Sequence, residues 1–324
     1  MIELSCLTFC RILTDPSSDR PRYVLAGTKT GYSVVQNTKD SPVTQHYLHH
    51  PGCGEYEFMW LLARHGTRNP SALTIRQIKR QLPKIRDQIL ANHREGRGDL
   101  CQGDLERLEG WEVDLGQEDD SLLTESGREE MVGLGSRWRR RVPGVVMVPE
   151  EIGYTDTQRT RESGREFARG FLNRTQVRLP PPVDNQQLLN FWVVCDRFRK
   201  NIQQKINTPL SPERKFIKLH TLPAVRDLVN KINLKLGYRN LTLTFKAVEL
   251  MWNMCRFELS FFLTKENSSS VDWPWCAVFS TEEMKILEKN EDLHYFFQDG
   301  YQYNITREMT AVLLNDLLGK YKTC

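Results

Sequence analysis

The segment RHGTRNP, residues 64–70, places one histidine between two arginines. A neutral imidazole attacks phosphorus directly and forms a covalent phosphohistidine, which divides one hard displacement into two easier ones. The guanidinium groups of Arg64 and Arg68 stay charged and bind phosphate oxygens through paired donors. Gly66 has no side chain that would keep a phosphate away from the backbone. These residue types at this spacing predict phosphoryl transfer to His65.

The loop follows an apolar run, residues 56–63, with the sequence YEFMWLLA. The run is short, rich in aromatic residues and free of glycine and proline, which is typical of a buried strand. Pro70 suits the end of a loop or the first turn of a helix. We therefore predict that the end of a strand presents His65 and its two arginines.

A second junction between a strand and a helix is predicted further along the chain. Residues 145–148, VVMV, read as a strand, and residues 155–163 read as a turn and the start of a helix. Helical spacing continues through Phe167, Phe171 and Leu172. The unpaired N–H groups and the positive dipole end of such a helix start favour a bound anion.

These segments carry a family resemblance. RHGTRNP after a buried strand resembles the signature of the histidine acid phosphatases. Four further segments resemble the multiple inositol polyphosphate phosphatases, a branch of that family: LAGTKTGY at 25–32, LTESGR at 123–128, WPWC with VF at 273–279, and GYQY at 300–303. The similarity runs from about residue 25 to about residue 318, although only the loop at His65 is specific on its own.

The resemblance implies an α/β fold, with a histidine-phosphatase core of the phosphoglycerate-mutase type and an α-helical insertion or cap. Residues 1–21 are expected to form a poorly defined N-terminal segment. The remainder is expected to be a single histidine phosphatase domain, 22–324, with its α/β core at about 22–70 and 142–175 and its helical cap at about 71–141 and 185–320.

The resemblance also implies the roles of the site residues. His65 is the expected nucleophile, and Arg64, Thr67 and Arg68 are expected to bind the substrate. Arg159 falls where the family has a second phosphate-binding arginine. The alternative for Arg159 is a solvated basic helix, because three more arginines follow it at 161, 165 and 169. Thr157-Gln158 departs from the Lys-His that often precedes this arginine in the inositol phosphatases, which leaves the substrate preference open.

The family completes its site with a late His-Asp or His-Ala-Glu element. Its histidine binds phosphate, and its acid protonates the leaving oxygen. None of the 7 histidines here is followed by Asp or by Ala-Glu. We therefore expect the general acid and the last core strand or strands to be missing from this chain. A positioned acid typically contributes about 10² to 10⁴ in rate, so binding of phosphate is expected to survive this loss better than turnover.

Two functional hypotheses follow from these residues. In the first, the chain hydrolyses phosphomonoesters of inositol hexakisphosphate and lower inositol polyphosphates through a phosphohistidine, with 2,3-bisphosphoglycerate as a further candidate substrate. In the second, the chain is a catalytically impaired pseudophosphatase, or a truncated isoform, that keeps the anion-binding clamp. The family needs no metal or other cofactor, so none is expected.

The composition limits other functions. The chain has 324 residues, 39% hydrophobic and 27% charged, which suffices for one substantial core. A formal charge of +4 is too modest to imply nucleic-acid binding. The basic cluster at 137–141 reads as a solvated helix face. No segment approaches the length of a transmembrane helix, and the sequence leaves the oligomeric state open.

The predicted location rests on short motifs. Four possible N-glycan acceptors, Asn173, Asn240, Asn267 and Asn304, favour the secretory pathway: the endoplasmic reticulum lumen, the exterior or the cell surface. Cys255 and Cys276, the second of which closes the WPWC segment, are the disulfide pair that we favour among the 8 cysteines. The first 13 residues contain no convincing signal peptide, which argues against that location.

Overall fold

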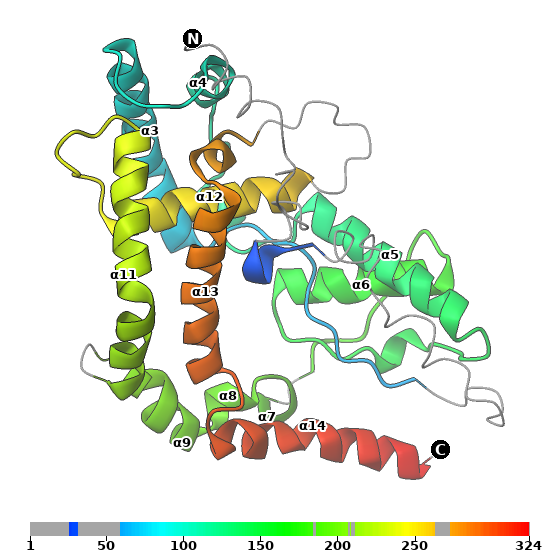
Figure 1. The fold of residues 1–324 in the computed structure, drawn as a ribbon. Helices are drawn as coiled ribbons and strands as arrows, with labels where there is room; N and C mark the ends of the chain where they lie inside the picture. Colours follow the sequence, from blue (N-terminus) through cyan, green and yellow to red (C-terminus); the bar gives the residue numbers. More distant parts are fainter. Residues whose placement is uncertain are drawn as a thin grey trace. The chain divides into compact units, whose positions relative to one another are not determined.

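A computed structural model describes residues 26–31, 59–183, 186–206, 208, 211–262 and 273–323. The described residues fall into two compact units. Unit 1 holds residues 26–31, 69–121 and the described part of 216–294, and unit 2 holds 59–68, the described part of 122–215, and 295–323. Both units are built from helices (Figure 1). Residues 1–21, expected as a separate N-terminal segment, and the glycan candidate Asn267 lie outside the described ranges.

The α/β core predicted from the sequence is not seen among the described residues, where no β-strand is assigned. The β-type pairing found there is an isolated antiparallel bridge between Arg68 and Leu123. A strand requires a neighbour that supplies a ladder of hydrogen bonds. The N–H group of Val145 instead donates to the Val142 carbonyl in a turn. The prediction that residues 59–63 and 145–148 form strands is therefore not confirmed.

Within these two segments, which were predicted as strands from continuous apolar runs, burial nevertheless alternates. Met59, Leu61, Val145 and Met147 pack against one hydrophobic cluster of unit 2. The intervening Val146 is 83% exposed. Alternating burial is thus present without the ladder, because the pattern specifies which side chains are buried and not which backbone groups pair.

Two packed helices form the centre of unit 2: α5 (Glu125–Arg141) and α6 (Gln158–Leu172). Both begin at threonine N-caps, Thr124 and Thr157, whose side chains accept backbone N–H groups. The helices approach closely: a Cβ added to Gly135 of α5 would lie 2.1 Å from the carbonyl oxygen of Phe167. Figure 1 shows the two helices side by side.

The rest of unit 2 is a set of short helices and one long one. α14 packs against α7, α8 and α9. The helical elements outside α5 and α6 are η5 (Pro149–Glu151), α7 (Gln186–Leu189), α8 (Phe191–Val194), α9 (Asp196–Phe198), the π-helix η6 (Arg199–Gln203), α10 (Gln204–Ile206) and α14 (Asn304–Thr323).

Unit 1 contains several long helices. Its elements are η2 (Gly27–Lys29), α3 (Ala72–Arg94), α4 (Gln102–Glu109), η4 (Gln117–Asp119), α12 (Phe245–Phe262) and η7 (Pro274–Val278), together with most of α11 (Pro212–Lys235) and α13 (Thr281–Gln298). Pro83 lies inside α3, which continues through it. No helix of the described residues has the length and apolarity needed to cross a membrane.

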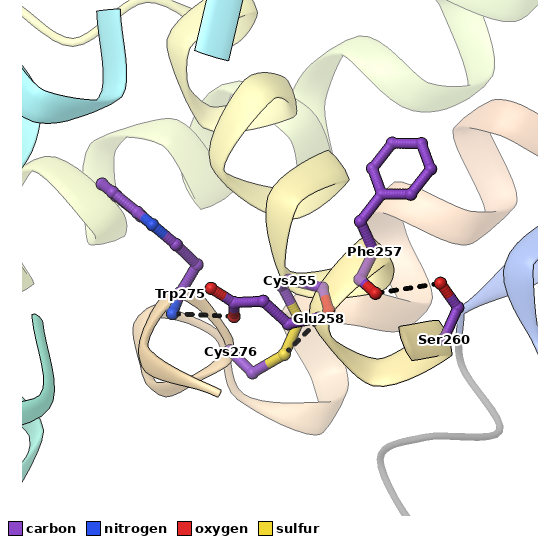
Figure 2. The surroundings of a disulfide bond; sticks show 6 residues. All are labelled: Cys255, Phe257, Glu258, Ser260, Trp275 and Cys276. Atoms are coloured by element: carbon purple, nitrogen blue, oxygen red, sulfur yellow. Dashed lines mark hydrogen bonds between the residues drawn. A yellow bond between two sulfur atoms is a disulfide. The ribbon is translucent and has the colours of Figure 1, made fainter. Parts of the chain in front are cut away.

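The core of unit 1 is organised around a disulfide and a buried tryptophan. Cys255 of α12 is bonded to Cys276 of η7, as predicted (Figure 2). Trp275, which is fully buried, meets Trp111 edge to face with ring centroids 5.2 Å apart. The N–H group of Trp275 donates to a carboxylate oxygen of Glu258 at 3.2 Å (Figure 2). A carboxyl group is therefore buried beside the disulfide and the two tryptophans.

Candidate functional site

Hydrogen bonds between the backbone of the loop at His65 and neighbouring side chains hold this loop in place. The N–H group of Gly66 donates to the Ser163 hydroxyl of α6 at 3.1 Å, and that of Thr67 donates to the Glu130 carboxylate of α5 at 2.8 Å. The carbonyl oxygen of Thr67 accepts from both the N–H and the hydroxyl of Thr124. The two central helices of unit 2 thus fix the loop through hydrogen bonds that leave its charged side chains uninvolved.

Gly66 has a packing role that the sequence did not reveal. A Cβ at Gly66 would lie 2.3 Å from the carbonyl oxygen of Gly127, and a Cβ at Gly127 would lie 2.1 Å from the carbonyl oxygen of Thr67. Both distances are far below any real Cβ contact, so the loop and the first turn of α5 meet backbone to backbone. The glycine of RHG and the glycine of LTESGR are therefore parts of one contact.

His65 is positioned with one ring nitrogen already engaged. Its Nδ1 lies 2.8 Å from the carbonyl oxygen of Gly66. A carbonyl oxygen accepts hydrogen bonds only, so Nδ1 carries the proton and donates it. In the neutral imidazole this leaves the lone pair on Nε2. The local backbone thus selects the tautomer in which Nε2 is the nucleophilic atom.

The surroundings of His65 favour that neutral form. Burial lowers the pKa of His65 and outweighs the hydrogen bond to Gly66, which raises it. The positive charges of Arg64, Arg159 and Arg68 lower the pKa further. The three predicted arginines therefore act electrostatically on the imidazole, and each of them disfavours a positively charged His65.

Arg159 lies in the first turn of α6, as the helical pattern predicts. Its Nε atom is buried and has no hydrogen-bond partner among the described residues. A buried guanidinium donor without a partner is costly unless a ligand satisfies it. The alternative of a solvated basic helix therefore describes Arg161, which is exposed, better than it describes Arg159.

Arg64 and Arg68 differ in their settings. The side of the loop that carries Arg64 is exposed to solvent. Arg68 is half-buried, and its backbone forms the bridge to Leu123. The structure thus brings Arg64, His65, Arg68 and Arg159 into one electrostatic group, while the roles of these residues and of Thr67 in binding and catalysis stay predictions.

Two residues that support this group, Ser163 and Glu130, were not singled out from the sequence. A third, Gln158, was noted there only as a departure from the family pattern; its side-chain amide oxygen accepts the N–H group of Leu123 at 2.9 Å. Ser163 follows Arg159 by four residues and so shares its helix face, which is a signal the spacing contained. The contacts of Glu130 and Gln158 depend on packing that no local pattern encodes.

A comparison with known proteins identifies the family. Residues 55–323 match the Histidine phosphatase superfamily (branch 2). This match covers most of the chain, so the chain belongs to that superfamily, and the resemblance to the histidine acid phosphatases is confirmed.

Curated relatives identify the branch. The chain is 30% identical over 303 residues to multiple inositol polyphosphate phosphatase 1 of Drosophila melanogaster, which covers 90% of this chain and 61% of the relative. It is 25% identical over 340 residues to the protein of the same name from Homo sapiens, covering 97% of this chain and 66% of the relative. It is 24% identical over 263 residues to the protein of the same name from Gallus gallus, and this match covers 78% of this chain and 53% of the relative. The chain therefore spans less than two thirds of the length of these relatives.

Proposed function

We propose that this chain transfers a phosphoryl group from inositol polyphosphates to His65 and thereby acts as a phosphomonoester hydrolase. The observation that carries the proposal is the setting of His65: Nδ1 lies within hydrogen-bond distance of the Gly66 carbonyl oxygen, and burial and three arginine charges lower the pKa of the imidazole. The names of the matched relatives support inositol polyphosphates as the substrate class, and we include inositol hexakisphosphate as a member of that class. We keep 2,3-bisphosphoglycerate as a further candidate substrate because it is a phosphomonoester anion, as the inositol polyphosphates are.

The proposed reaction begins with attack of the Nε2 lone pair on phosphorus. A bond forms between Nε2 and phosphorus while the bond from phosphorus to the leaving oxygen breaks. Arg64, Arg68 and Arg159 neutralise the charge on the transferred group as it develops, and Thr67 lies on the loop that faces it. Water then attacks the phosphohistidine, which releases inorganic phosphate and returns His65 to its starting state.

The leaving oxygen requires a proton when the substrate is an inositol phosphate, because an alkoxide is a poor leaving group. The residues that we propose for the reaction do not include the donor of this proton. A substrate such as p-nitrophenyl phosphate releases a stabilised phenolate and depends much less on this proton. Comparing the two substrates therefore separates the nucleophile and its arginines from the acid.

Single-turnover trapping tests the proposal. Purified protein is mixed with radiolabelled p-nitrophenyl phosphate or inositol hexakisphosphate and quenched in base, which preserves phosphohistidine. We expect an acid-labile phosphoprotein from wild type and none from His65→Ala, with the exposed His220→Ala as the matched control. Bound substrate without a phosphoprotein from either compound would overturn the proposal and favour the non-catalytic anion-binding alternative.

We propose further that the chain has the α/β core and helical cap of its superfamily, with bounds as predicted from the sequence, and that it enters the secretory pathway. The Cys255–Cys276 bond supports that location, as do the exposed acceptors Asn173, Asn240 and Asn304. Expression in a secretory host should give a protein whose mobility changes after removal of N-glycans. An unglycosylated product with reduced Cys255 and Cys276 would contradict this location.

A further inference from the structure

Unit 2 contains a second basic site, on a different face of α6. A hollow of about 480 Å³ lies between α6 and the segment that follows it, up to Leu179. Five arginines line it: Arg128, Arg161, Arg165, Arg169 and Arg178. Arg165 follows Arg159 by six residues, which turns it about 120° around the helix from Arg159. The hollow is therefore distinct from the group around His65.

Two glutamates also line the hollow, and both are buried. Glu162 accepts from Arg128 at 2.6 Å and from Arg165 at 3.0 Å, and Glu166 accepts from Arg169 at 2.5 Å. Since each carboxylate is already occupied by guanidinium groups, it orients these arginines and repels an anion less than a free carboxylate would. Five arginines against two glutamates leave the lining with a net positive charge of three.

The arginines keep donors that the protein does not use. A guanidinium group has five N–H donors, and the bonds to Glu162 and Glu166 occupy only some of them. The Nε atom of Arg169 is buried with no hydrogen-bond partner among the described residues. Arg178 is exposed and forms no ion pair or side-chain hydrogen bond within the part of the chain that is described. A network that existed only to join α5 and α6 would not need Arg178.

We propose that this hollow binds a small molecule carrying several phosphate or sulfate groups. Its volume lies in the range of small-ligand sites, and clustered arginines match the paired oxygens of such groups. The site is independent of the reaction proposed for His65, because it uses none of the residues assigned to that reaction. It would give the protein a second, non-reacting contact with polyphosphorylated ligands.

The test uses the full chain and myo-inositol hexakissulfate, a polyanion that phosphatases cannot hydrolyse, in isothermal titration. We expect two binding events in wild type. Arg178→Glu should weaken one of them at least tenfold, while Arg174→Glu should weaken neither appreciably. Arg174 is the matched control because it is exposed on the same segment and does not line the hollow. Arg159→Ala should remove the other event and leave the Arg178-dependent one.

Three results would overturn the proposal. The first is equal binding by the Arg178→Glu and Arg174→Glu variants. The second is a single binding event in wild type that Arg159→Ala abolishes, which would assign all binding to the His65 group. The third is binding of long heparin chains with none of hexakissulfate, which would make the surface a macromolecular contact. Arg178→Ala provides a milder variant should the charge reversal impair folding, and it should weaken the same event.

Discussion

His65 of unit 2 and Glu258 of unit 1 are both titratable side chains that burial drives toward the neutral form. Burial lowers the pKa of His65. Burial also raises the pKa of Glu258, which is 4% exposed, well above its ordinary value. Removing water penalises whichever form is charged, so a base and an acid shift in opposite directions for one reason.

The two groups differ in what surrounds them. Three arginine charges act on His65, and its loop is partly open to solvent. Glu258 faces Trp111 and Trp275 beside the Cys255–Cys276 bond, and the N–H groups that lower its pKa offset burial only in part. A shifted pKa therefore indicates reactivity only when charge and access accompany it. The chemistry proposed for His65 meets this condition, whereas for Glu258 we expect a pH-dependent effect on folding stability.

Among the substitutions that test this difference between His65 and Glu258, we expect the largest effect from Arg159→Ala. Loss of one guanidinium from the developing charge should slow phosphohistidine formation by about 10² to 10³. Stability should change little, because Arg159 forms no ion pair with another described residue. Rapid-quench trapping with p-nitrophenyl phosphate measures the rate, and the exposed Arg139→Ala is the matched control. Equal rates for both variants would remove Arg159 from the site.

The next effect concerns the disulfide beside Glu258. Replacing both Cys255 and Cys276 by serine should lower the free energy of unfolding by about 3 kcal/mol, since the bond closes a loop of 21 residues. Urea unfolding measures this change. Cys195→Ser serves as control because Cys195 is a free thiol. If the double variant instead lost phosphohistidine formation and kept its stability, the division of roles between the two regions would be wrong.

A smaller effect is expected from Glu258→Gln, and it depends on pH. The folded state holds a proton on Glu258 that the unfolded state releases above its ordinary pKa of 4.5. Wild-type stability should therefore be complete at lower pH and decline as pH rises toward the raised pKa, by at most about 1.4 kcal/mol per pH unit.

The variant removes this titration. Denaturant unfolding at several pH values should give a flatter profile for Glu258→Gln than for wild type, whereas the exposed Glu282→Gln should follow wild type. A wild-type profile that rises with pH over this window would mean that Glu258 is ionised in the folded protein.

The smallest effects are expected on His65 itself. Each arginine that is removed should raise the pKa of His65, with Arg64→Ala raising it most, followed by Arg159→Ala and then Arg68→Ala. NMR titration of the imidazole measures the order. An unchanged pKa in all three variants would show that the arginines do not act on the imidazole electrostatically.

The sequence predicted those features that depend on local chemistry. The helix that carries Arg159 was predicted from apolar residues at helical spacing, and it is observed as α6. The Cys255–Cys276 bond, inferred through the WPWC segment, is also observed.

Features that depend on contacts between distant segments were not predictable in this way. Strand pairing needs a partner, so the apolar run at 145–148 could not specify a ladder. The contact between Gly66 and Gly127 joins two motifs that were interpreted separately. Glu258 gave no signal, because an acid in a largely apolar helix is informative only once its burial is known.

The most direct test of the account is to identify which nitrogen of His65 carries the phosphoryl group. Because Nδ1 donates to the carbonyl oxygen of Gly66, the trapped intermediate should be phosphorylated at Nε2. Phosphorus NMR of the base-stabilised phosphoprotein, compared with the two synthetic phosphohistidine isomers, distinguishes the positions. We predict the Nε2 isomer alone; phosphorylation at Nδ1, or on a residue other than His65, would contradict the account.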